Sequence, residues 1–483
     1  MKTSFALRLS IGVLIMMIGL GCTPKEGKEF DGGANSPEAK APEGDKLVIY
    51  QMMVRLFGNQ NTTNKTFGTL EENGCGKMND ITDKALLELR TFGVTHVWYT
   101  GLLDHATMSA FPDANIQADD ADVVKGRAGS PYAIKDYYDI SPALATEPLT
   151  RMEEFEALVK RSHDNQLKVI IDFVPNHVAR AYHSEVKPEG TQDLGESDST
   201  ELQFAANNNF YYIPKSKFKV PEYDPLGEAE EAPGEDGKFE EQPAKATGNN
   251  VFSDSPSVND WFETVKLNYG VEHTDTAQIK HFDPIPSTWL KMRDILLFWA
   301  GKGVDGFRCD MAEMVPVEFW AWAIADVKKQ YPDIIFIAEI YNPVIYHDFV
   351  ETGGFDYLYD KVGVYDRIRA LMQGNPDANT TAIVEAMDQG KGIEEKMLRF
   401  LENHDEQRIA SSAFAGDAKA AIPGMTVTAL LGRGPVMLYF GQESGEKGEG
   451  EEGFQGEDGR TTIFDYWGCL LYTSDAADDM QCV

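Results

Sequence analysis

Cysteine is scarce in this sequence, and its placement excludes two classes of protein. Five cysteines are scattered over 483 residues, at positions 22, 75, 309, 469 and 482. An odd, scattered set gives neither a disulfide framework nor the paired spacing of a structural metal site. We therefore expect a hydrophobic core to hold the fold together, and 42% hydrophobic and 11% aromatic residues are enough for a large one.

Basic residues are also in short supply. The sequence has 44 Lys and Arg against 78 Asp and Glu, which gives a formal net charge of −34. A surface of this sign repels nucleic acid, so we expect no nucleic-acid partner. Part of the charge lies in residues 221–250, which are rich in Gly, Pro and Glu, and there we expect a mobile loop.

Long hydrophobic runs are rare as well. Residues 9–20 form an apolar run after a basic start, and the run is too short for an ordinary membrane span. This layout is typical of a signal peptide. The run leads into Cys22 and resembles a bacterial lipobox, although Gly19 stands where that motif usually has leucine.

The resemblance implies cleavage after residue 21 and lipidation of the Cys22 thiol. Residues 1–21 would be a lipoprotein signal peptide and residues 22–45, which are polar and charged, a flexible tether. The protein would then be anchored in a bacterial cell envelope. Because Thr23 rather than aspartate follows the cysteine, the outer membrane is expected. The alternative is an ordinary secretory signal with an incidental cysteine.

Short apolar segments alternate with segments of helical spacing along most of the remaining chain. Strands are predicted at residues 46–54, 95–100, 167–173, 304–309, 334–338, 355–359, 397–401 and 435–440. Helices are predicted at 80–92, 151–166, 287–301, 316–330 and 418–431. Eight strands in this rhythm predict an α/β fold, a (β/α)8 TIM barrel.

The interval between the third and fourth strands is far longer than a strand–helix–strand connection needs. Residues 180–283 are therefore predicted to be an inserted domain, called domain B, between strand 3 and helix 3. Residues 46–179 and 284–466 would form the barrel, incomplete at its C-terminal end. Residues 468–483 differ from everything before them and are predicted to be a non-native tail; the alternative is a true acidic terminus.

Polar side chains follow four of the predicted strands at their C-terminal ends. These ends are residues 172–177, 308–310, 338–339 and 402–405. This edge of a barrel is where active sites lie. Any single carboxylate is also consistent with a helix cap, and Arg308 with Asp310 is consistent with a structural ion pair. Four convergent ends favour an active site.

Glycoside cleavage is the chemistry that needs this set. One carboxylate attacks the anomeric carbon while a protonated carboxyl group protonates the leaving oxygen. Asp310 and Glu339 lie on neighbouring strands, where carboxyl groups can stand roughly 5–5.5 Å apart, as retention of configuration requires. Arg308 shares a strand face with Asp310 and would keep it ionised.

In order and content, these segments resemble the motifs of the α-amylase family, glycoside hydrolase family 13. Residues 172–177, 306–310, 337–339 and 402–405 resemble its first four motifs. Residues 265–268 resemble the motif of domain B, and residues 130–137 resemble the segment that carries a sugar-stacking tyrosine. The resemblance spans about residues 47–466.

The resemblance implies a retaining hydrolase of α-glucosidic bonds in starch-like α-glucans or maltooligosaccharides, acting in carbohydrate catabolism. Three carboxylates would carry the reaction: the nucleophile Asp310, the general acid/base Glu339 and the transition-state stabiliser Asp405. Four residues would position or bind: Arg308 on the nucleophile, Tyr132 against the sugar ring, and His177 and His404 on its hydroxyls. Asn176 would bind a structural Ca²⁺, a cation that takes oxygen ligands; the alternative is a loop hydrogen bond.

Two departures from the family pattern leave the specificity open. Glu313 and Met314 stand three and four positions after Asp310, where many α-amylases have Lys-His, and Ser130 stands where histidine is frequent. An α-1,6-acting or transglycosylating enzyme of the same family is therefore a second reading. A non-catalytic sugar-binding lipoprotein of the same fold is a third, which the loss of any catalytic acid would favour.

Overall fold

The computed structural model describes residues 46–448 and 458–466, apart from residues 225, 227–231, 233 and 274–276. The predicted signal peptide with Cys22, the predicted tether and the predicted tail at 468–483 lie outside the described residues, as does part of the predicted mobile loop. Within the described part of the chain, no helix is long and apolar enough to cross a membrane.

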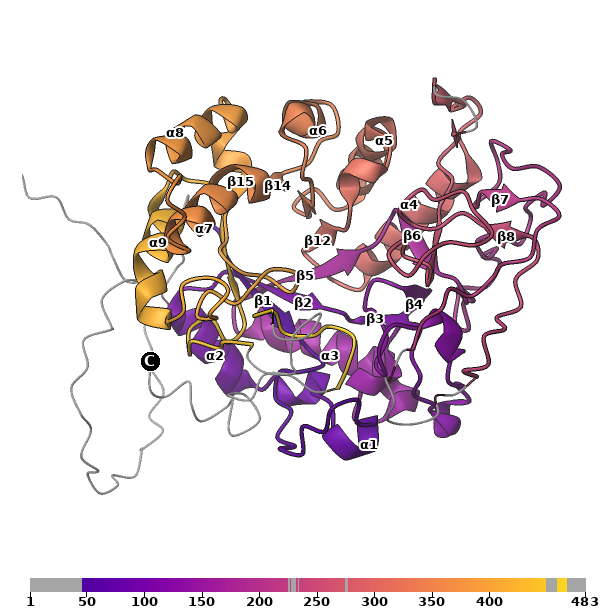
Figure 1. Ribbon diagram of the computed structural model, residues 1–483, viewed down its shortest axis with the longest axis horizontal. Coiled ribbons are helices and arrows are strands. Elements are labelled where there is room, and N and C mark those ends of the chain that lie inside the picture. The colour runs from indigo at the N-terminus through magenta and orange to yellow at the C-terminus, as the bar shows by residue number, and fades with distance from the viewer. Residues whose placement is uncertain are drawn as a thin grey trace, which may run out of the picture.

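Eight parallel strands form the centre of the molecule (Figure 1). They are β1 (Val48–Met53), β2 (His96–Thr100), β5 (Lys168–Phe173), β12 (Gly306–Cys309), β13 (Ile335–Ala338), β14 (Tyr357–Tyr359), β15 (Met397–Leu398) and β16 (Val436–Tyr439). Their order in the sheet is β15-β14-β13-β12-β5-β2-β1-β16. The two outer strands also meet, because Arg399, next to β15, pairs in parallel with Val436 of β16. The predicted TIM barrel is therefore confirmed.

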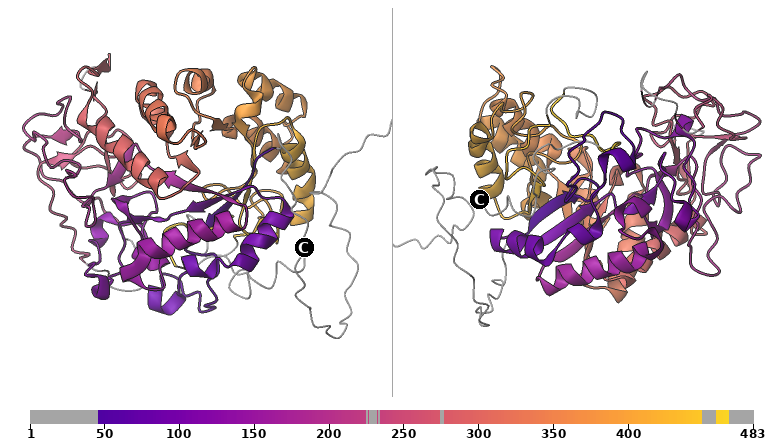
Figure 2. Two further views of the ribbon diagram at one scale, coloured as in Figure 1. Left: turned by 180° about the vertical axis from the view of Figure 1, so that it is seen from behind. Right: turned by 90° about the horizontal axis from the view of Figure 1, so that it is seen from below.

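Helices lie around the outside of this sheet (Figures 1 and 2). They are α1 (Leu70–Asn73), α2 (Asp83–Phe92), α3 (Arg151–Asp164), α4 (Ser287–Gly301), α5 (Val317–Gln330), α6 (Tyr346–Glu351), α7 (Asp366–Met372), α8 (Thr381–Met387) and α9 (Ala418–Leu430). The five predicted helices agree with α2, α3, α4, α5 and α9 to within a few residues.

Side chains alternate across strand β12 and separate the core from the barrel interior. Phe307 and Cys309 belong to the hydrophobic core, where the Phe307 ring lies 5.5 Å from the ring of Phe336 on β13. Arg308 points to the other side and is completely buried. The strand therefore delivers one charged side chain to the interior, and Cys309 is a core residue, as predicted.

Domain B is built from short antiparallel pairs between β5 and α4, at the right in Figure 1. The pairs are β6 (His177–Ala179) with β9 (Thr264–Lys266), β7 (Tyr212–Ile213) with β8 (Ala244–Lys245), and β10 (Val271–Glu272) with β11 (Ile279–Lys280). A further pair, β3 (Leu103–His105) with β4 (Ile134–Ile140), extends the loop after β2. The first strand of the insertion begins at His177, slightly ahead of the predicted boundary at 180.

Residues 458–466 pack against loops that belong to the first third of the chain. The Arg55 guanidinium donates to the Ile463 carbonyl at 2.7 Å, and the Ala128 amide donates to the Phe464 carbonyl at 2.9 Å. The Arg127 amide donates to the Asp465 carboxylate at 2.9 Å. Residues 458–466 therefore pack as part of the barrel domain. That the barrel is incomplete at its C-terminal end stays a prediction.

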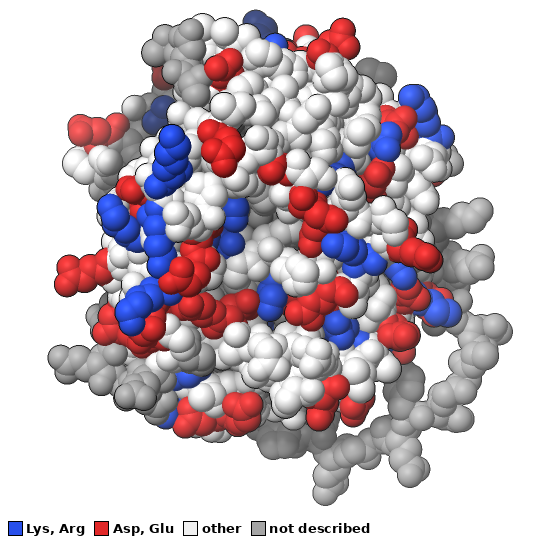
Figure 3. Space-filling view, turned by 90° about the vertical axis from the view of Figure 1, so that its right-hand side faces the viewer, with Lys and Arg blue, Asp and Glu red and all other residues white. Residues whose placement is uncertain are grey.

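The surface carries charges of both signs despite the large net charge. On the face shown in Figure 3, Lys and Arg side chains lie among Asp and Glu side chains. Exposed ion pairs occur in the described part of the chain, for example Lys217 with Glu240 at 2.5 Å and Lys280 with Glu318 at 2.6 Å. Exposed pairs of this kind contribute about 0–1 kcal/mol each, so they add little to stability.

Candidate active site

A cleft of about 1170 Å³ opens between the strand ends of the barrel and domain B. Its walls include all three predicted acids, Asp310, Glu339 and Asp405. Tyr132 and His177 also line it, together with aromatic residues of domain B and residues 462–465 of the last described segment. Side chains predicted from separate stretches of sequence therefore meet in one cavity.

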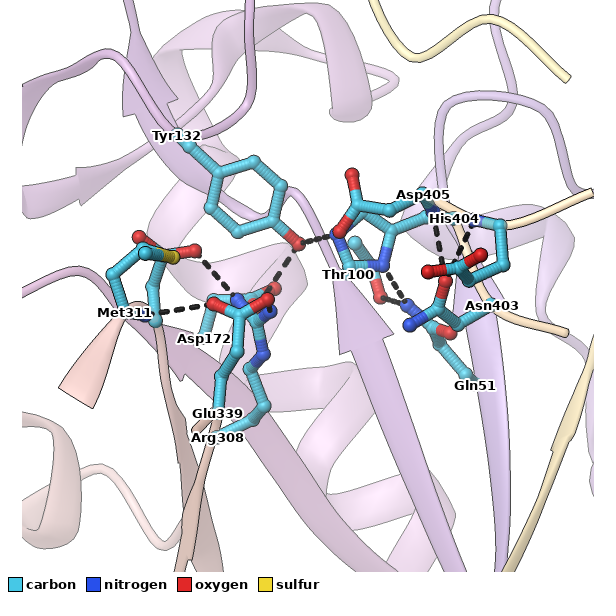
Figure 4. A network of polar contacts seen from close by, with 12 residues as sticks. Gln51, Thr100, Tyr132, Asp172, Arg308, Met311, Glu339, Asn403, His404 and Asp405 are labelled. Carbon is cyan, nitrogen blue, oxygen red and sulfur yellow. Dashed lines mark hydrogen bonds and ion pairs between the residues drawn. The ribbon is translucent and has the colours of Figure 1, made fainter. Parts of the chain in front are cut away.

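Arg308 is the centre of the charged cluster at the bottom of this cleft (Figure 4). One terminal nitrogen, Nη1, lies 2.8 Å from Asp310 Oδ1, and the other, Nη2, lies 2.8 Å from Glu339 Oε1. Its Nε donates to the Tyr359 hydroxyl at 3.2 Å. A single buried guanidinium therefore holds both carboxylates side by side, which is compatible with the roughly 5–5.5 Å separation of a retaining pair.

Asp310 has one occupied oxygen and one free oxygen. Oδ1 accepts from Arg308, whereas Oδ2 has no hydrogen-bond partner among the residues that the structure describes. Burial raises the pKa of Asp310, and the adjacent Arg308 charge opposes the rise. Because Asp310 lines the cleft, its free oxygen can attack a carbon bound there.

Glu339 is surrounded by donors and by other acids. The Met311 amide donates to Oε2 at 2.7 Å and the Tyr341 hydroxyl donates to Oε1 at 2.7 Å. Burial raises the pKa of Glu339 to about 7; Arg308 opposes this rise, whereas the charges of Asp310 and Asp405 add to it. The carboxyl group therefore holds a proton near neutral pH, as a general acid must.

The backbone of Met311 has a left-handed conformation, with φ of 42° and ψ of 42°. A non-glycine residue adopts this region at a cost, and such residues cluster at functional sites. Met311 follows Asp310 directly, and its conformation accompanies the amide hydrogen bond to Glu339. The turn after β12 therefore links the two acids through the backbone as well as through Arg308.

Asp405 belongs to a second group of polar contacts, on the other side of Tyr132 in Figure 4. The His404 Nε2 atom lies 3.1 Å from Asp405 Oδ2 and 2.6 Å from the Tyr132 hydroxyl. The amide nitrogen of Gln51 lies 2.8 Å from His404 Nδ1 and donates to it, which leaves the ring proton on Nε2. His404 is thus fixed with its N–H toward the acid.

Glu339 and Asp405 differ in charge state because their surroundings differ. Burial opposes ionisation of Asp405, but the electrostatic and hydrogen-bond contact with His404 and the charges of Arg308 and Arg460 outweigh it and lower its pKa. The Asp405 side chain also keeps 34% of its surface exposed toward the cleft. One acid is therefore kept protonated near neutral pH while another is kept ionised, which is the division of roles that double displacement requires.

His177 lines the cleft from the first strand of domain B. Its ring lies 5.4 Å from the ring of Trp261, and burial lowers its pKa to about 3, so the imidazole is neutral. The ring nitrogen Nδ1 lies 3.1 Å from the amide nitrogen of Asn176. The neutral ring can donate one hydrogen bond to a bound hydroxyl.

The residues around Asn176 do not fit a calcium ion. The amide oxygen that would bind the metal accepts a hydrogen bond from the ammonium of Lys266, and the amide nitrogen donates to the Gly248 carbonyl at 2.9 Å. Burial lowers the pKa of Lys266 to about 7. The Asn176 and Met314 oxygens accept hydrogen bonds from its protonated form. Asn176 therefore makes a hydrogen bond where a calcium ligand was predicted, and no step of the chemistry is assigned to a metal.

Sequence reasoning missed Tyr341 and the role of Glu313. Tyr341 stands two residues after Glu339 but beyond the end of β13, so strand alternation does not place its hydroxyl beside the acid. The Glu313 carboxylate accepts from the backbone amides of Tyr341 at 3.2 Å and Asn342 at 3.0 Å. The residue that departs from the family pattern therefore holds the turn that carries Tyr341.

Trp261 was also missed, because it belongs to none of the motifs that marked the other residues. It lies in a domain B loop, has a positive φ of 47° and lines the cleft. Ser130, the second departure, accepts a hydrogen bond from the Tyr132 amide at 3.2 Å. Its hydroxyl thus supports the turn that presents the predicted stacking tyrosine.

Comparison with known proteins identifies the family and agrees with the fold. A family model described as "Alpha amylase, catalytic domain" matches residues 56–465. The chain is 24% identical over 435 residues to a cyclomaltodextrin glucanotransferase from Geobacillus stearothermophilus, a match that covers 84% of this chain and 50% of that protein. It is also 24% identical over 439 residues to an α-amylase from Streptomyces lividans, covering 84% of this chain and 43% of that one.

The chain thus spans about half the length of these curated relatives. Among solved structures, an α-amylase from Lactobacillus plantarum superposes with a TM-score of 0.54 at 22% identity, covering 90% of this chain and 80% of that one. A cyclic α-maltosyl-(1→6)-maltose hydrolase from Arthrobacter globiformis gives 0.54 at 17% identity, covering 89% and 82%. These structural likenesses support the fold.

Proposed function

The chain belongs to the α-amylase family, and from this premise we propose that it cleaves α-glucosidic bonds in starch-like α-glucans or maltooligosaccharides with retention of configuration. The observation that carries the proposal is the position of Arg308, which binds Asp310 through one nitrogen and Glu339 through the other, both at 2.8 Å. This arrangement sets a nucleophile and a protonated acid on neighbouring strands, facing one cleft.

The first half of the reaction follows from the state of each acid. Glu339 gives its proton to the glycosidic oxygen as the bond to the anomeric carbon breaks. Asp310 Oδ2 attacks that carbon and forms a covalent glycosyl–enzyme ester. Asp405, which is held ionised, stabilises the positive charge that develops on the sugar ring in the transition state.

The second half returns the enzyme to its starting state. Glu339, now ionised, takes a proton from an incoming water molecule, whose oxygen attacks the anomeric carbon. The ester bond to Asp310 breaks, and the product leaves with the α configuration it started with. Two inversions at one carbon give net retention.

Three side chains are placed to hold the sugar at the reacting bond. The Tyr132 ring lines the cleft beside His404, with 5.1 Å between the ring centroids, and offers a flat face for a pyranose ring. His177 supplies a ring nitrogen for a hydroxyl group. His404 can do so only where the hydroxyl replaces Asp405 or Tyr132 at Nε2, because Gln51 occupies Nδ1. Trp261 and Tyr341 add further aromatic surface along the same cleft, which suits an oligosaccharide longer than one unit.

Transfer to a sugar acceptor is the second candidate function. The Tyr341 hydroxyl lies beside Glu339 in the cleft. The turn that carries Tyr341 is held by Glu313, and Glu313 and Met314 stand where many α-amylases have Lys-His. Several matched relatives are named glucanotransferases or maltosyltransferases. The same acids serve both reactions, so the acceptor side of the cleft sets the ratio, and action on α-1,6 bonds depends on the same region.

A non-catalytic sugar-binding role is less well supported. It would require the loss of at least one catalytic acid, whereas Asp310, Glu339 and Asp405 all line one cleft. The pKa of Glu339 is also raised to about 7. A general acid needs such a raised pKa, whereas a residue that only binds sugar does not.

We also propose that Cys22 carries a lipid that anchors the protein in a bacterial envelope, with the outer membrane as the expected site. The support is the signal-peptide layout and the lipobox-like end of residues 1–22. Cys22→Ala should move the expressed protein from the membrane fraction to the soluble fraction. If the variant stays in the membrane fraction, the lipid anchor at this residue is wrong.

The experiment that tests the main proposal follows the anomer formed first. Incubation with maltooligosaccharides should give the α-anomer at early times in proton NMR, before mutarotation. Comparison of starch, pullulan and isomaltose as substrates, with and without a sugar acceptor, separates hydrolysis from transfer and α-1,4 from α-1,6 cleavage. A β-anomer as first product would exclude the double-displacement mechanism.

A further inference from the structure

Lys266 is a buried cation that faces neutral oxygen atoms. It ends strand β9 of domain B, and 3% of its surface is exposed. Its ammonium donates to the amide oxygen of Asn176 and, at 3.1 Å, to the backbone carbonyl of Met314. No carboxylate of the described residues pairs with it, and burial lowers its pKa without an opposing negative charge. The positive charge is therefore balanced by dipoles alone.

The two acceptors follow two paired neighbouring strands of the barrel, β5 and β12. Asn176 follows β5 of the barrel, and Met314 ends η7 (Ala312–Met314), the short turn after the nucleophile strand β12. Lys266 itself lies in domain B, opposite His177 in the register of β6 with β9. One ammonium thus ties domain B to two neighbouring strand ends of the barrel.

An amide oxygen and a backbone carbonyl are also the kind of ligands that a calcium ion takes. We propose that the ammonium of Lys266 stands in this chain where a structural cation would otherwise bind, so that the cleft is held together without calcium at Asn176. A lysine ammonium is a compact positive charge with three donors and no acceptor. It can therefore occupy an oxygen-lined position, where it binds hydrogen-bond acceptors and requires no fixed coordination geometry.

The same contact fixes the proton of the substrate-binding histidine. Because the ammonium only donates, the oxygen of the Asn176 amide has to face it, and the amide nitrogen faces the other way. That nitrogen lies 2.9 Å from the Gly248 carbonyl and 3.1 Å from His177 Nδ1. His177 Nδ1 must then accept, and the ring proton lies on Nε2. Lys266 is therefore a positioning residue that acts on His177 through Asn176.

The proposal goes beyond the proposed function, because it concerns how the cleft is held and not which bond is cleaved. It predicts that the identity of residue 266 decides whether calcium changes the melting temperature of the protein. Replacing Lys266 by aspartate removes the internal cation and adds a third oxygen ligand to the two already present. The variant should therefore acquire a calcium site that the natural chain does not have.

Thermal unfolding of the purified protein, with a chelator and with millimolar CaCl2, tests this directly. The melting temperature of the natural chain should be the same in both. Lys266→Asp should melt several degrees lower than the natural chain in chelator and recover on addition of calcium, with calcium binding seen by calorimetry. Lys280→Asp, which changes a half-exposed lysine of the same domain, should show no calcium response.

Lys266→Met keeps the experiment decisive if the aspartate variant does not fold. It retains the length of the side chain but leaves both oxygens without a donor, so we expect a lower melting temperature that calcium does not restore. In ¹⁵N NMR, His177 should show the Nε2–H tautomer in the natural chain and lose that fixed state in Lys266→Met. KM should rise more than kcat falls, because His177 binds substrate and does not transfer the proton.

Two results would overturn the inference. One is a natural chain that loses several degrees of melting temperature in chelator and regains them with calcium, because a metal ion would then hold the fold. The other is an unchanged His177 tautomer in Lys266→Met. Neither result bears on the anomer of the first product, so failure here is distinguishable from failure of the proposed function.

Discussion

Two buried cations hold the walls of the cleft, and they do so in opposite ways. Arg308 is completely buried and faces carboxylates, Asp310 and Glu339. Lys266 is almost as buried and faces an amide oxygen and a backbone carbonyl. A cation among acids changes which of them is protonated, whereas a cation among neutral oxygens changes only where they lie. The first contact therefore serves chemistry and the second serves geometry.

This difference separates residues whose loss stops the reaction from residues whose loss weakens the fold. Around Arg308, ion pairing and burial work against each other, and the acids reach different charge states. A buried ion pair contributes little net stability, because the cost of desolvating the two charges offsets most of their attraction. A buried arginine with a nucleophile and an acid on its two nitrogens is better explained by function.

The sharpest test of this comparison exchanges a carboxylate for an amide at each kind of site. Asp310→Asn should lower kcat by about 10⁴-fold or more, the scale of losing a covalent nucleophile, with little change in melting temperature. Binding of maltooligosaccharides, measured by calorimetry, should remain. An active Asp310→Asn variant would contradict the assignment of the nucleophile.

Asp360→Asn is the matched control for this substitution. Asp360 is equally buried, accepts from the Val364 amide at 2.9 Å and pairs with Arg399 at 3.2 Å, but does not line the cleft. Its loss should lower the melting temperature and leave kcat within a fewfold of the natural value. If both variants behaved alike, the distinction between catalytic and structural acids would fail.

The pH dependence gives the second largest effect. Glu339 has a pKa of about 7, so kcat/KM should fall as the pH rises through 7 and the acid loses its proton. On the acidic side, activity should fall as Asp310 is protonated, above the usual range of an aspartate because burial raises its pKa. A rate that stays constant from neutral to alkaline pH would contradict the assignment of the acid.

The same pKa predicts a change in stability that does not depend on substrate. The folded-state pKa of Glu339 lies above its ordinary value of 4.5, so its protonated form favours the folded state. This contribution is complete below pH 4.5 and is lost as the pH rises toward 7. Glu339→Gln should therefore flatten the fall in melting temperature over this interval.

The smallest effect is expected at Tyr341. Its hydroxyl donates to Glu339 and favours the ionised carboxylate, so Tyr341→Phe should raise the pKa of the acid and move the alkaline limb of kcat/KM to higher pH. Loss of one such hydrogen bond is worth about 1 kcal/mol, or roughly fivefold in rate. Tyr346→Phe removes a buried hydroxyl that has no partner among the described residues and should leave the limb in place.

The sequence was sufficient where a function depends on local pattern. The barrel strands were predicted because apolar runs such as residues 304–309 are short and punctuated by glycine, and the structure places β12 at Gly306–Cys309. Asp310 and Glu339 directly follow β12 and β13, and parallel strands bring such ends to one edge. Asp405 lies further beyond β15, and the resemblance to the family's fourth motif is what implied its role.

The sequence was insufficient where the partner is set by packing between distant segments. Asn176 was predicted to bind calcium from its place in a motif, but its actual partner, Lys266, is 90 residues away in sequence. Only the register of β6 with β9 brings that ammonium to the amide. Tyr341 and Trp261 lie in turns outside any strand, where alternation no longer fixes the direction of a side chain.

The segment at residues 458–466 has a consequence for how short an active chain can be. Its carbonyls receive hydrogen bonds from Arg55 and Ala128, and residues 462–465 line the same cleft as Asp310. All three acids and the last barrel strand precede this segment in the chain. A chain that ends near residue 448 would therefore keep the acids but leave the cleft open on one side, and full activity should require residues 458–466.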